Sequence, residues 1–393
     1  MRALVRSLAL FTVLGCTASH DVAPAPEPAS SDPAFPRRSP RFERGGRLLG
    51  YVANRRADSV SVLDLDAMTE LGEVPVGRDP VDVDGPRHAV ADPAAGALYL
   101  VLSYPLVADS PHAVENNGGP RDGYLLELAL DDLRPLGSVR VAPSPTELVL
   151  SDDRRLLAVT HQDTVLALKN TPDIDARRAS LALVQPTSDM SDGAATLSLV
   201  PTCVAPAAVA LSGDGTRAYV ACTGEDTLAV VDTVGKAVTA RIPAGALPAN
   251  KPYALTRSPA GTRLALSNQV AQTLVVFSTG DVPAPLATLP TSGVPFFAGF
   301  HGESELLVPV QEPDGVMRVD LTTATIAQAV TYADDTCQNP SDAHFSADGR
   351  VFLVCEGNHY GPGSVVELDP STLAIIARVD VGVYPDRLAV VEP

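Results

Sequence analysis

Acidic and basic side chains recur at one position of several short apolar segments that begin with proline. Two residues after the proline stand Glu147 in PTELVLS, Asp342 in PSDAHFS and Arg387 in PDRLAVV, and we place Arg87 of a further segment at the same level. If these segments lie side by side, the two guanidinium groups can grip a carboxylate or phosphate. The alternative is a set of ion pairs, Arg87 with Glu147 and Arg387 with Asp342, that only stabilises the fold.

Histidines near these positions add candidate acid–base and metal chemistry. His344 stands two residues after Asp342, so His344, Asp342 and Glu147 are the candidate catalytic residues. His161 ends an apolar segment and joins the candidate ligand-binding residues. No cofactor is predicted, although a divalent metal is compatible with these side chains. The weaker candidates for such a metal, with unconnected surface side chains as the alternative, are His161, His359 and Glu356.

Four cysteines occupy equivalent places in two parts of the chain. Cys203 precedes one apolar segment and Cys222 ends the next, and Cys337 and Cys355 have the same arrangement further along. An even number of cysteines in an exported chain favours two disulfides, each joining two neighbouring loops. The alternative is a soft-metal site, but the usual Cys-x-x-Cys spacing is absent from the sequence.

Composition and missing motifs narrow the function. The 393 residues are 45% hydrophobic and 19% charged, which suffices for a sizeable core, while 35 prolines and 29 glycines disfavour long helices. A net charge of −18 argues against a nucleic-acid partner, which requires a positive surface. The sequence contains no Gly-x-Ser-x-Gly, His-Glu-x-x-His, Walker or dinucleotide-binding motif.

The first 45 residues are typical of an exported and tethered protein. Two arginines and a short apolar run in residues 1–15 indicate a signal peptide, and the run is too short to span a bilayer. The segment resembles that of a bacterial lipoprotein, in which Cys16 receives a lipid. Residues 16–45 are rich in proline, alanine and serine and predict an extended tether. We therefore expect a cell-envelope lipoprotein of the outer membrane.

An internal repeat dominates the remaining residues, 46–393. Its units contain apolar runs that alternate with period two and are separated by turns, which indicates strands. The segments YVAN…DSVSVLDLD…VPVG and AYVAC…DTLAVVDT resemble the YVTN-repeat β-propeller family (YncE-like) of bacterial surface and periplasmic proteins. The resemblance implies a propeller scaffold and says little about chemistry.

Seven proline-led or equivalent inner strands predict an all-β, seven-bladed β-propeller. The last of them, residues 385–391, has no outer strands after it, and the strands at 48–76 have no inner strand before them. We therefore expect the C-terminal strand to close the first blade, which removes open sheet edges. Six blades with a stray C-terminal strand is the alternative. Two long inserts, 104–123 and 162–179, should emerge on one face.

Three functions remain open at this stage. The first is a monomeric, lipid-anchored binding or scaffold protein of the cell envelope, whose loop-rich face binds a protein, a glycan or a small anionic ligand. The second is a lactonase-like hydrolase with an acid and a histidine in the central funnel, because propellers similar to this family include lactonases. The third is an accessory subunit of an envelope redox system, although the absence of Trp disfavours a Trp-derived cofactor.

Overall fold

The computed structural model describes residues 41–393 except 44, 78–82, 105–121, 187–189, 191–195, 247 and 334. The expected signal peptide, the lipidation site Cys16 and most of the expected tether lie outside these residues, as does most of the first insert. Phe42, from the end of that tether, is 4% exposed and its N–H donates to the Asp131 carbonyl. Contacts with the propeller therefore begin a few residues before residue 46.

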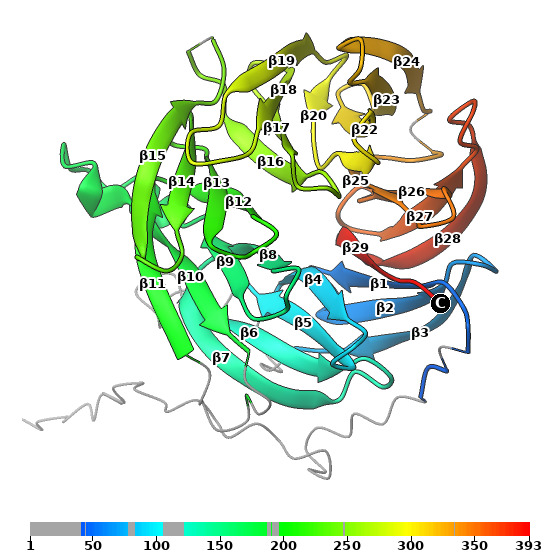
Figure 1. Cartoon of the computed structure of the whole chain (residues 1–393). Coiled ribbons are helices and arrows are strands. Elements are labelled where there is room, and N and C mark those ends of the chain that lie inside the picture. Colours follow the sequence, from blue (N-terminus) through cyan, green and yellow to red (C-terminus); the bar gives the residue numbers. More distant parts are fainter. Residues whose placement is uncertain are drawn as a thin grey trace, which may run out of the picture.

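Seven antiparallel sheets, the blades, surround a central axis (Figure 1). From the axis outwards, blade 1 contains β29 (Pro385–Val391), β1 (Leu49–Asn54), β2 (Ser59–Asp64) and β3 (Thr69–Pro75). Blade 2 contains β4 (Pro86–Asp92), β5 (Ala97–Leu102), β6 (Asp122–Ala129) and β7 (Pro135–Pro143). Blade 3 contains β8 (Pro145–Leu150), β9 (Leu157–His161), β10 (Ala179–Gln185) and β11 (Thr196–Cys203). Blade 4 contains β12 (Pro206–Leu211), β13 (Arg217–Cys222), β14 (Thr227–Asp232) and β15 (Ala237–Pro243). Blade 5 contains β16 (Pro252–Arg257), β17 (Arg263–Asn268), β18 (Thr273–Ser278) and β19 (Pro285–Pro290). Blade 6 contains β20 (Val294–Pro295), β21 (Gly299–His301), β22 (Glu305–Gln311), β23 (Gly315–Asp320) and β24 (Thr325–Thr331). Blade 7 contains β25 (Pro340–Phe345), β26 (Val351–Cys355), β27 (Pro362–Leu368) and β28 (Ile375–Val383).

The C-terminal strand closes the ring, as the repeat pattern predicted. β29 pairs antiparallel with β1, so that Leu49 lies opposite Val391 and Tyr51 opposite Ala389. In Figure 1 the red end of the chain accordingly lies beside the blue N-terminal sheet. The seven-bladed prediction is confirmed and the six-bladed alternative is wrong.

Neighbouring blades pack face to face through the apolar side chains of their strands. Strands β1, β2 and β5 are buried along their whole length. The tyrosines of the two repeat segments add a hydrogen bond to the next blade: Tyr51 donates to the Leu130 carbonyl at 2.8 Å, and Tyr219 to the Gly280 carbonyl at 3.2 Å. Each blade thus buries its faces only against its neighbours, which makes ring closure a condition of stability.

The start of each inner strand defines one face of the disc, which we call the proline face. In six blades the residue before the proline has a positive φ, which turns the chain from the outer strand of one blade to the axis of the next; these residues are Gly85, Ser144, Ala205, Lys251, Asn339 and Tyr384. The opposite face, where the first and second strands of a blade join, we call the hairpin face.

The inner strand of blade 6 is interrupted between β20 and β21. Phe297, in the gap, forms a parallel bridge with Asp342 of blade 7, and its N–H donates to the Ser341 carbonyl at 3.0 Å. Gly299 permits the close approach, since a Cβ at this residue would lie 2.4 Å from the Ala343 carbonyl oxygen. Blades 6 and 7 are therefore joined by backbone hydrogen bonds next to the axis.

Both predicted disulfides are present. Cys203 bonds to Cys222 with a Cα–Cα distance of 5.8 Å, and Cys337 to Cys355 with 5.2 Å. Cys337 lies in the loop before β25 and Cys355 ends β26, so this bond joins two parts of blade 7, as expected. Cys203, however, is the last residue of β11 in blade 3, and Cys222 ends β13 in blade 4, so the other bond joins two neighbouring blades rather than two loops of one blade. The soft-metal alternative for these cysteines is wrong.

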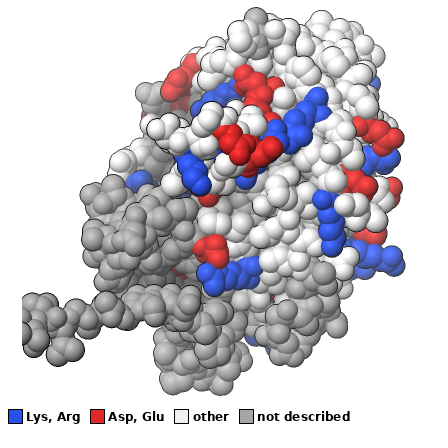
Figure 2. Space-filling model, turned by 90° about the vertical axis from the view of Figure 1, so that its left-hand side faces the viewer, with Lys and Arg blue, Asp and Glu red and all other residues white. Residues whose placement is uncertain are grey.

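The second insert carries helix α1 (Thr164–Ala167) and the 3-10 turn η1 (Asp175–Arg177) on the proline face, between β9 and β10. The side of the disc that carries β11 and β15 shows acidic and basic side chains next to one another rather than in separate fields (Figure 2). Among the residues described, no helix has the length and apolar character needed to cross a membrane.

Candidate functional site

A layer of charged side chains crosses the axis near the proline face. Two residues after the inner proline stand Arg387 of blade 1, His88 of blade 2, Glu147 of blade 3 and Asp342 of blade 7. The expectation that Arg87 occupies this level is wrong, because β4 begins at Pro86 and so brings His88 to it. The small or aromatic residues Ala208, Ala254 and Phe297 complete the layer.

Glu147 is the centre of this layer and is 2% exposed. Arg387 Nη1 donates to its Oε1 oxygen, and His88 Nδ1 lies 3.2 Å from the same oxygen. The Leu148 N–H also donates to His88 Nδ1, at 3.1 Å. A single ring nitrogen cannot accept from Leu148 and donate to Glu147 at once. Without a hydrogen, Nδ1 accepts from the Leu148 N–H; with a hydrogen, it donates to Glu147.

Asp342 binds the other side of Arg387. Arg387 Nε donates to Asp342 Oδ1 at 3.3 Å, and the Leu388 N–H donates to Oδ2 at 3.1 Å. Burial raises the pKa of Asp342, and the charge of Arg387 opposes that rise. The guanidinium also lies 4.1 Å from the centre of the Phe297 ring. The predicted Arg387–Asp342 pair therefore forms, together with a pair to Glu147.

Arg87 lies one layer closer to the proline face and does not pair with Glu147 as expected. Its Nε donates to Asp386 Oδ2 at 3.0 Å, and Arg55 Nε lies 3.9 Å from the same oxygen. Burial acts to raise the pKa of Asp386, but the charges of Arg87 and Arg55 outweigh it and hold the pKa below its usual value. Both arginines that were candidates for gripping an anion are thus already neutralised by carboxylates.

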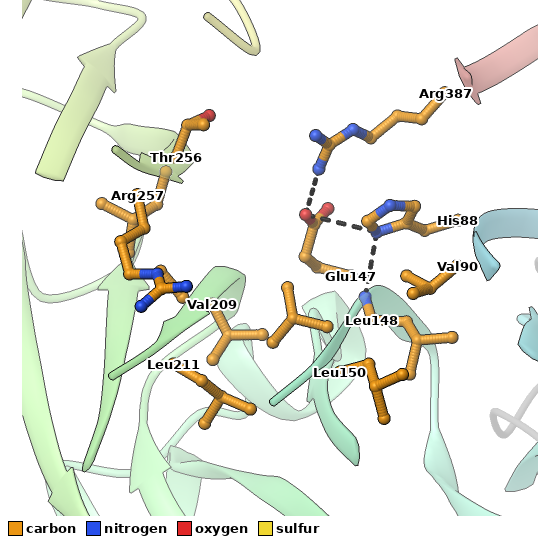
Figure 3. Close-up of a pocket in the computed structure, with 13 residues that line it drawn as sticks. His88, Val90, Glu147, Leu148, Leu150, Val209, Leu211, Thr256, Arg257 and Arg387 are labelled. Carbon is orange, nitrogen blue, oxygen red and sulfur yellow. Dashed lines mark hydrogen bonds and ion pairs between the residues drawn. The ribbon is translucent and has the colours of Figure 1, made fainter. Parts of the chain in front are cut away.

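A cavity of about 260 Å³ lies next to the charged layer on the side of the hairpin face (Figure 3). Glu147, His88 and Arg387 line its inner end, and the remaining lining is mostly aliphatic: Val90, Leu148, Val149, Leu150, Val209, Ala210, Leu211 and Leu255. Glu147 and Leu148 are buried, whereas Leu150 and Arg257, further along the strands, are partly exposed. The cavity therefore opens towards the hairpin face, whereas the sequence placed a funnel at the strand starts.

The outer part of the cavity is lined by Thr256 and Arg257. Arg257 Nη2 donates to Asp152 Oδ1 at 2.6 Å, so its charge is also paired. Thr256 Oγ1 is buried and has no hydrogen-bond partner in the described part of the chain. A buried hydroxyl without a partner costs free energy, so it is a natural contact for a bound molecule.

The two buried histidines predicted for the site do not line this cavity. His344 lies on β25, and burial lowers its pKa to about 4. His161 is 1% exposed, its Nδ1 lies 2.8 Å from the Ser180 carbonyl oxygen, and burial lowers its pKa to about 4 as well. Nε2 of His161 has no partner among the described residues. Both rings are therefore neutral at pH 7, and neither stands at the cavity.

A second polar cluster, the rim cluster, lies on the proline face between blades 7 and 1 and comprises Glu356, His359, Tyr384, Arg55 and Arg56. His359 Nε2 lies 2.7 Å from Glu356 Oε2, and the His359 ring stacks on Tyr384 with centroids 3.8 Å apart. His161 does not join Glu356 and His359 as a ligand, since no three His, Cys, Asp or Glu of the described residues are arranged to hold a metal.

Some of these residues escaped the sequence analysis. His88 is found if the second blade is aligned on Pro86 like the others, and Asp386 is the residue after the proline in PDRLAVV. Arg55 and Tyr384 have no such signal in the sequence. Arg55 lies in the β1–β2 turn and Tyr384 in the β28–β29 turn, and these two turns are neighbours only because β29 pairs with β1.

The closed ring of seven sheets defines a seven-bladed β-propeller with a charged layer at its axis. No known family profile matches the sequence, and no curated protein matches it. Among solved structures, PpgL, a periplasmic gluconolactonase of Pseudomonas aeruginosa, superposes with a TM-score of 0.62 at 18% identity over 88% of this chain and 99% of that one. A putative 6-phosphogluconolactonase of Bacteroides uniformis gives 0.62 at 14% identity, over 88% and 100% of the two chains. The dihydro-heme d1 dehydrogenase NirN gives 0.57 at 18% identity, over 92% and 78%. At these identities the likeness shows the fold alone.

Proposed function

We propose that this protein is a binding protein of the cell envelope and that the axial cavity holds its ligand, a small uncharged molecule. The observation that carries the proposal is the 260 Å³ cavity with aliphatic walls and a charged inner end. Ligand sites are typically concave and mostly apolar, with a few polar groups that orient the ligand. This volume is near the lower limit of such sites, which favours a compact ligand.

The charges at the inner end favour an uncharged ligand. Two carboxylates, Glu147 and Asp342, share the single guanidinium of Arg387. An anion would place a third negative charge beside them, whereas a cation would find both carboxylates already paired with Arg387. Either charge would also lose its hydration against aliphatic walls.

Two polar atoms are suited to orient such a ligand. The contacts of the Glu147 carboxylate with Arg387 and His88 both use Oε1, and Oε2 has no contact in the described part of the chain (Figure 3). Thr256 Oγ1 also lacks a partner there. A primary amide on a compact aliphatic body matches this arrangement, because its N–H donates to Glu147 at the inner end and its aliphatic part fits the walls, while Thr256 offers a second polar contact further out.

The test compares three probes of one shape by thermal unfolding and calorimetry: cyclohexanecarboxamide, cyclohexanecarboxylate and cyclohexylammonium. We expect the amide to raise the melting temperature by about 1–3 °C at saturating concentration and the two ions to have no effect. Ala210→Leu, which fills the cavity, should abolish the shift, and Thr256→Val should weaken it. A stronger shift with the carboxylate, or an equal shift in Ala210→Leu, would contradict the proposal.

The envelope location is proposed from the signal peptide and Cys16, and the two disulfides agree with an oxidising compartment. In this proposal a lipid on Cys16 anchors the protein to the outer membrane. Labelling of the full chain with radioactive palmitate should be lost in Cys16→Ser. Retention of the label in that variant would contradict lipidation at this residue.

The lactonase alternative gains support from the names of two structural neighbours, but not from the central funnel. Glu147 and Asp342 are held in ion pairs, and His344 does not line the cavity. A sugar lactone carries hydroxyl groups on every side, which aliphatic walls would leave unpaired. A role as an accessory redox subunit stays a prediction, because the structural neighbour NirN supports only the fold.

A further inference from the structure

The rim cluster contains a histidine that a carboxylate holds in place at the surface. His359 Nε2 lies 2.7 Å from Glu356 Oε2, so that in the neutral ring Nε2 carries the hydrogen and Nδ1 the free electron pair. Glu356 is 9% exposed, whereas the His359 side chain is 33% exposed. A buried acid thus orients an imidazole that solvent reaches, which is the arrangement of a general base and its orienting group.

The loop that carries the pair is fixed by several covalent and polar contacts. Cys355, directly before Glu356, is bonded to Cys337. Asn339 Nδ2 donates to the Gly357 carbonyl at 2.9 Å, and Asn358 Oδ1 accepts from the Gly361 N–H at 2.8 Å. A rigid support of this kind keeps a reacting group within a narrow range of positions.

Side chains from three loops meet in the rim cluster. Tyr384, from the β28–β29 turn, stacks on the ring, and Arg56, from the β1–β2 turn, donates to the His359 carbonyl at 3.1 Å. Arg55 lies 4.3 Å from the centre of the Tyr384 ring on the same side of the disc. Of the charged side chains in the rim cluster, Glu356 contacts the imidazole, Arg56 contacts the backbone carbonyl of His359, and Arg55 contacts the ring of Tyr384.

We propose that His359, oriented by Glu356, is the general base of a hydrolytic site for aryl esters on the proline face. His359 Nδ1 takes a proton from a water molecule while the water oxygen forms a bond to the ester carbonyl carbon. The C–O bond to the leaving group then breaks, and the proton passes from His359 to the departing phenolate, which leaves the acid and the phenol. The site lies apart from the axial cavity and requires no ligand there.

The substrate class follows from the side chains next to the imidazole. Tyr360 directly follows His359 and is 81% exposed. The Arg56 guanidinium lies 4.8 Å from the centre of the Tyr360 ring. An exposed ring is a surface on which another aromatic group stacks, and the Arg56 guanidinium adds positive charge next to that surface.

The chain offers a matched control in His301. This histidine also contacts a carboxylate, Glu305, with Nδ1 to Oε2 at 3.5 Å, and stacks on an aromatic ring, that of Phe345. It lies on the hairpin face, outside the rim cluster. His301→Gln therefore measures the hydrolysis that any surface histidine of this kind supports.

The experiment measures hydrolysis of p-nitrophenyl acetate by the folded wild-type protein and its variants across pH. We expect His359→Gln to lower kcat/KM by about 10² or more and His301→Gln to leave it unchanged. Glu356→Gln keeps a hydrogen-bond acceptor but removes the charge, so it should lower kcat/KM less and move the acidic, ascending limb of the pH profile to lower pH. Equal rates for the wild type and His359→Gln, or an equal loss in His301→Gln, would overturn the proposal.

Discussion

Arg387 on the closing strand β29 forms an ion pair with Glu147 on β8, 240 residues earlier in the chain. The two residues belong to blades 1 and 3, so the pair crosses the axis beside blade 2, whose His88 contacts the same carboxylate. The contact exists only because the C-terminal strand completes the first blade. The last strand therefore both closes the ring and supplies one of the residues at the inner end of the axial cavity.

Removal of the Arg387 charge should destabilise the fold. Arg387→Met leaves the buried carboxylates of Glu147 and Asp342 without a counter-charge, which typically costs about 3–5 kcal/mol. The free energy of unfolding in guanidinium chloride at neutral pH measures this loss. The double variant Arg387→Met/Glu147→Gln should recover part of it, because one buried charge is then removed.

A surface arginine supplies the control for that variant. Arg378 is 42% exposed and pairs with Asp380, which is 68% exposed. Arg378→Met should cost less than about 1 kcal/mol, because solvent screens exposed pairs. Equal losses in the two arginine variants would show that Arg387 is not buried in a charged layer.

Closure can be tested at the contact between blade 7 and the closing strand. A Cβ on Gly363 would lie 2.4 Å from Cγ of Pro385, the first residue of β29. Gly363→Ala should therefore destabilise the protein by about 1–3 kcal/mol, as overpacking usually does. Gly361→Ala is the matched control, because its Cβ would meet only Asn358 Oδ1 at 3.6 Å. Similar melting temperatures for the two variants would contradict the close packing of β29.

Stability should fall in mild acid because of His161. Burial lowers its pKa from the ordinary 6.5 to about 4, so between these values the unfolded chain binds a proton that the folded protein does not. Stability is therefore lost as the pH falls through this range, by about 3 kcal/mol for this residue. His161→Gln should reduce the slope of unfolding free energy against pH, and an unchanged slope would contradict the burial of a neutral ring. Some slope should remain, because the pKa of His344 is lowered in the same way.

Each disulfide should contribute measurably to stability. Cys203 and Cys222 are 19 residues apart, and closing a loop of that length contributes about 3 kcal/mol in the chain-entropy model. The paired variant Cys203→Ser/Cys222→Ser should lose this amount in chemical unfolding, and reductant should affect it less than the wild type. Four free thiols in the denatured, unreduced protein would rule both bonds out.

The sequence predicted the scaffold because local signals repeat in every blade. The inner prolines, the alternating apolar runs and the unpaired strands at the two ends of the chain led to seven blades and closure. The four cysteines occupy corresponding places in two blades, so their pairing also followed from the repeat. These features follow from the place of each residue in the repeat, although the Cys203–Cys222 bond joins two neighbouring blades.

The site was harder to predict because it depends on contacts between blades. A difference of one residue in the alignment of β4 placed Arg87 where His88 stands. The partner of Arg87, Asp386, belongs to the last strand of the chain, and their contact requires the closed ring. The cavity results from the combined size of side chains on five inner strands, which no single repeat reveals.

A structure of crystals soaked in cyclohexanecarboxamide tests the central claim most directly. We predict density for the probe in the axial cavity, with its amide next to Glu147 and its ring between Leu148 and Leu211. Ala210→Leu crystals treated in the same way should show none. An empty cavity in the wild type at saturating probe, or density only outside it, would contradict the assignment of this cavity as the ligand site.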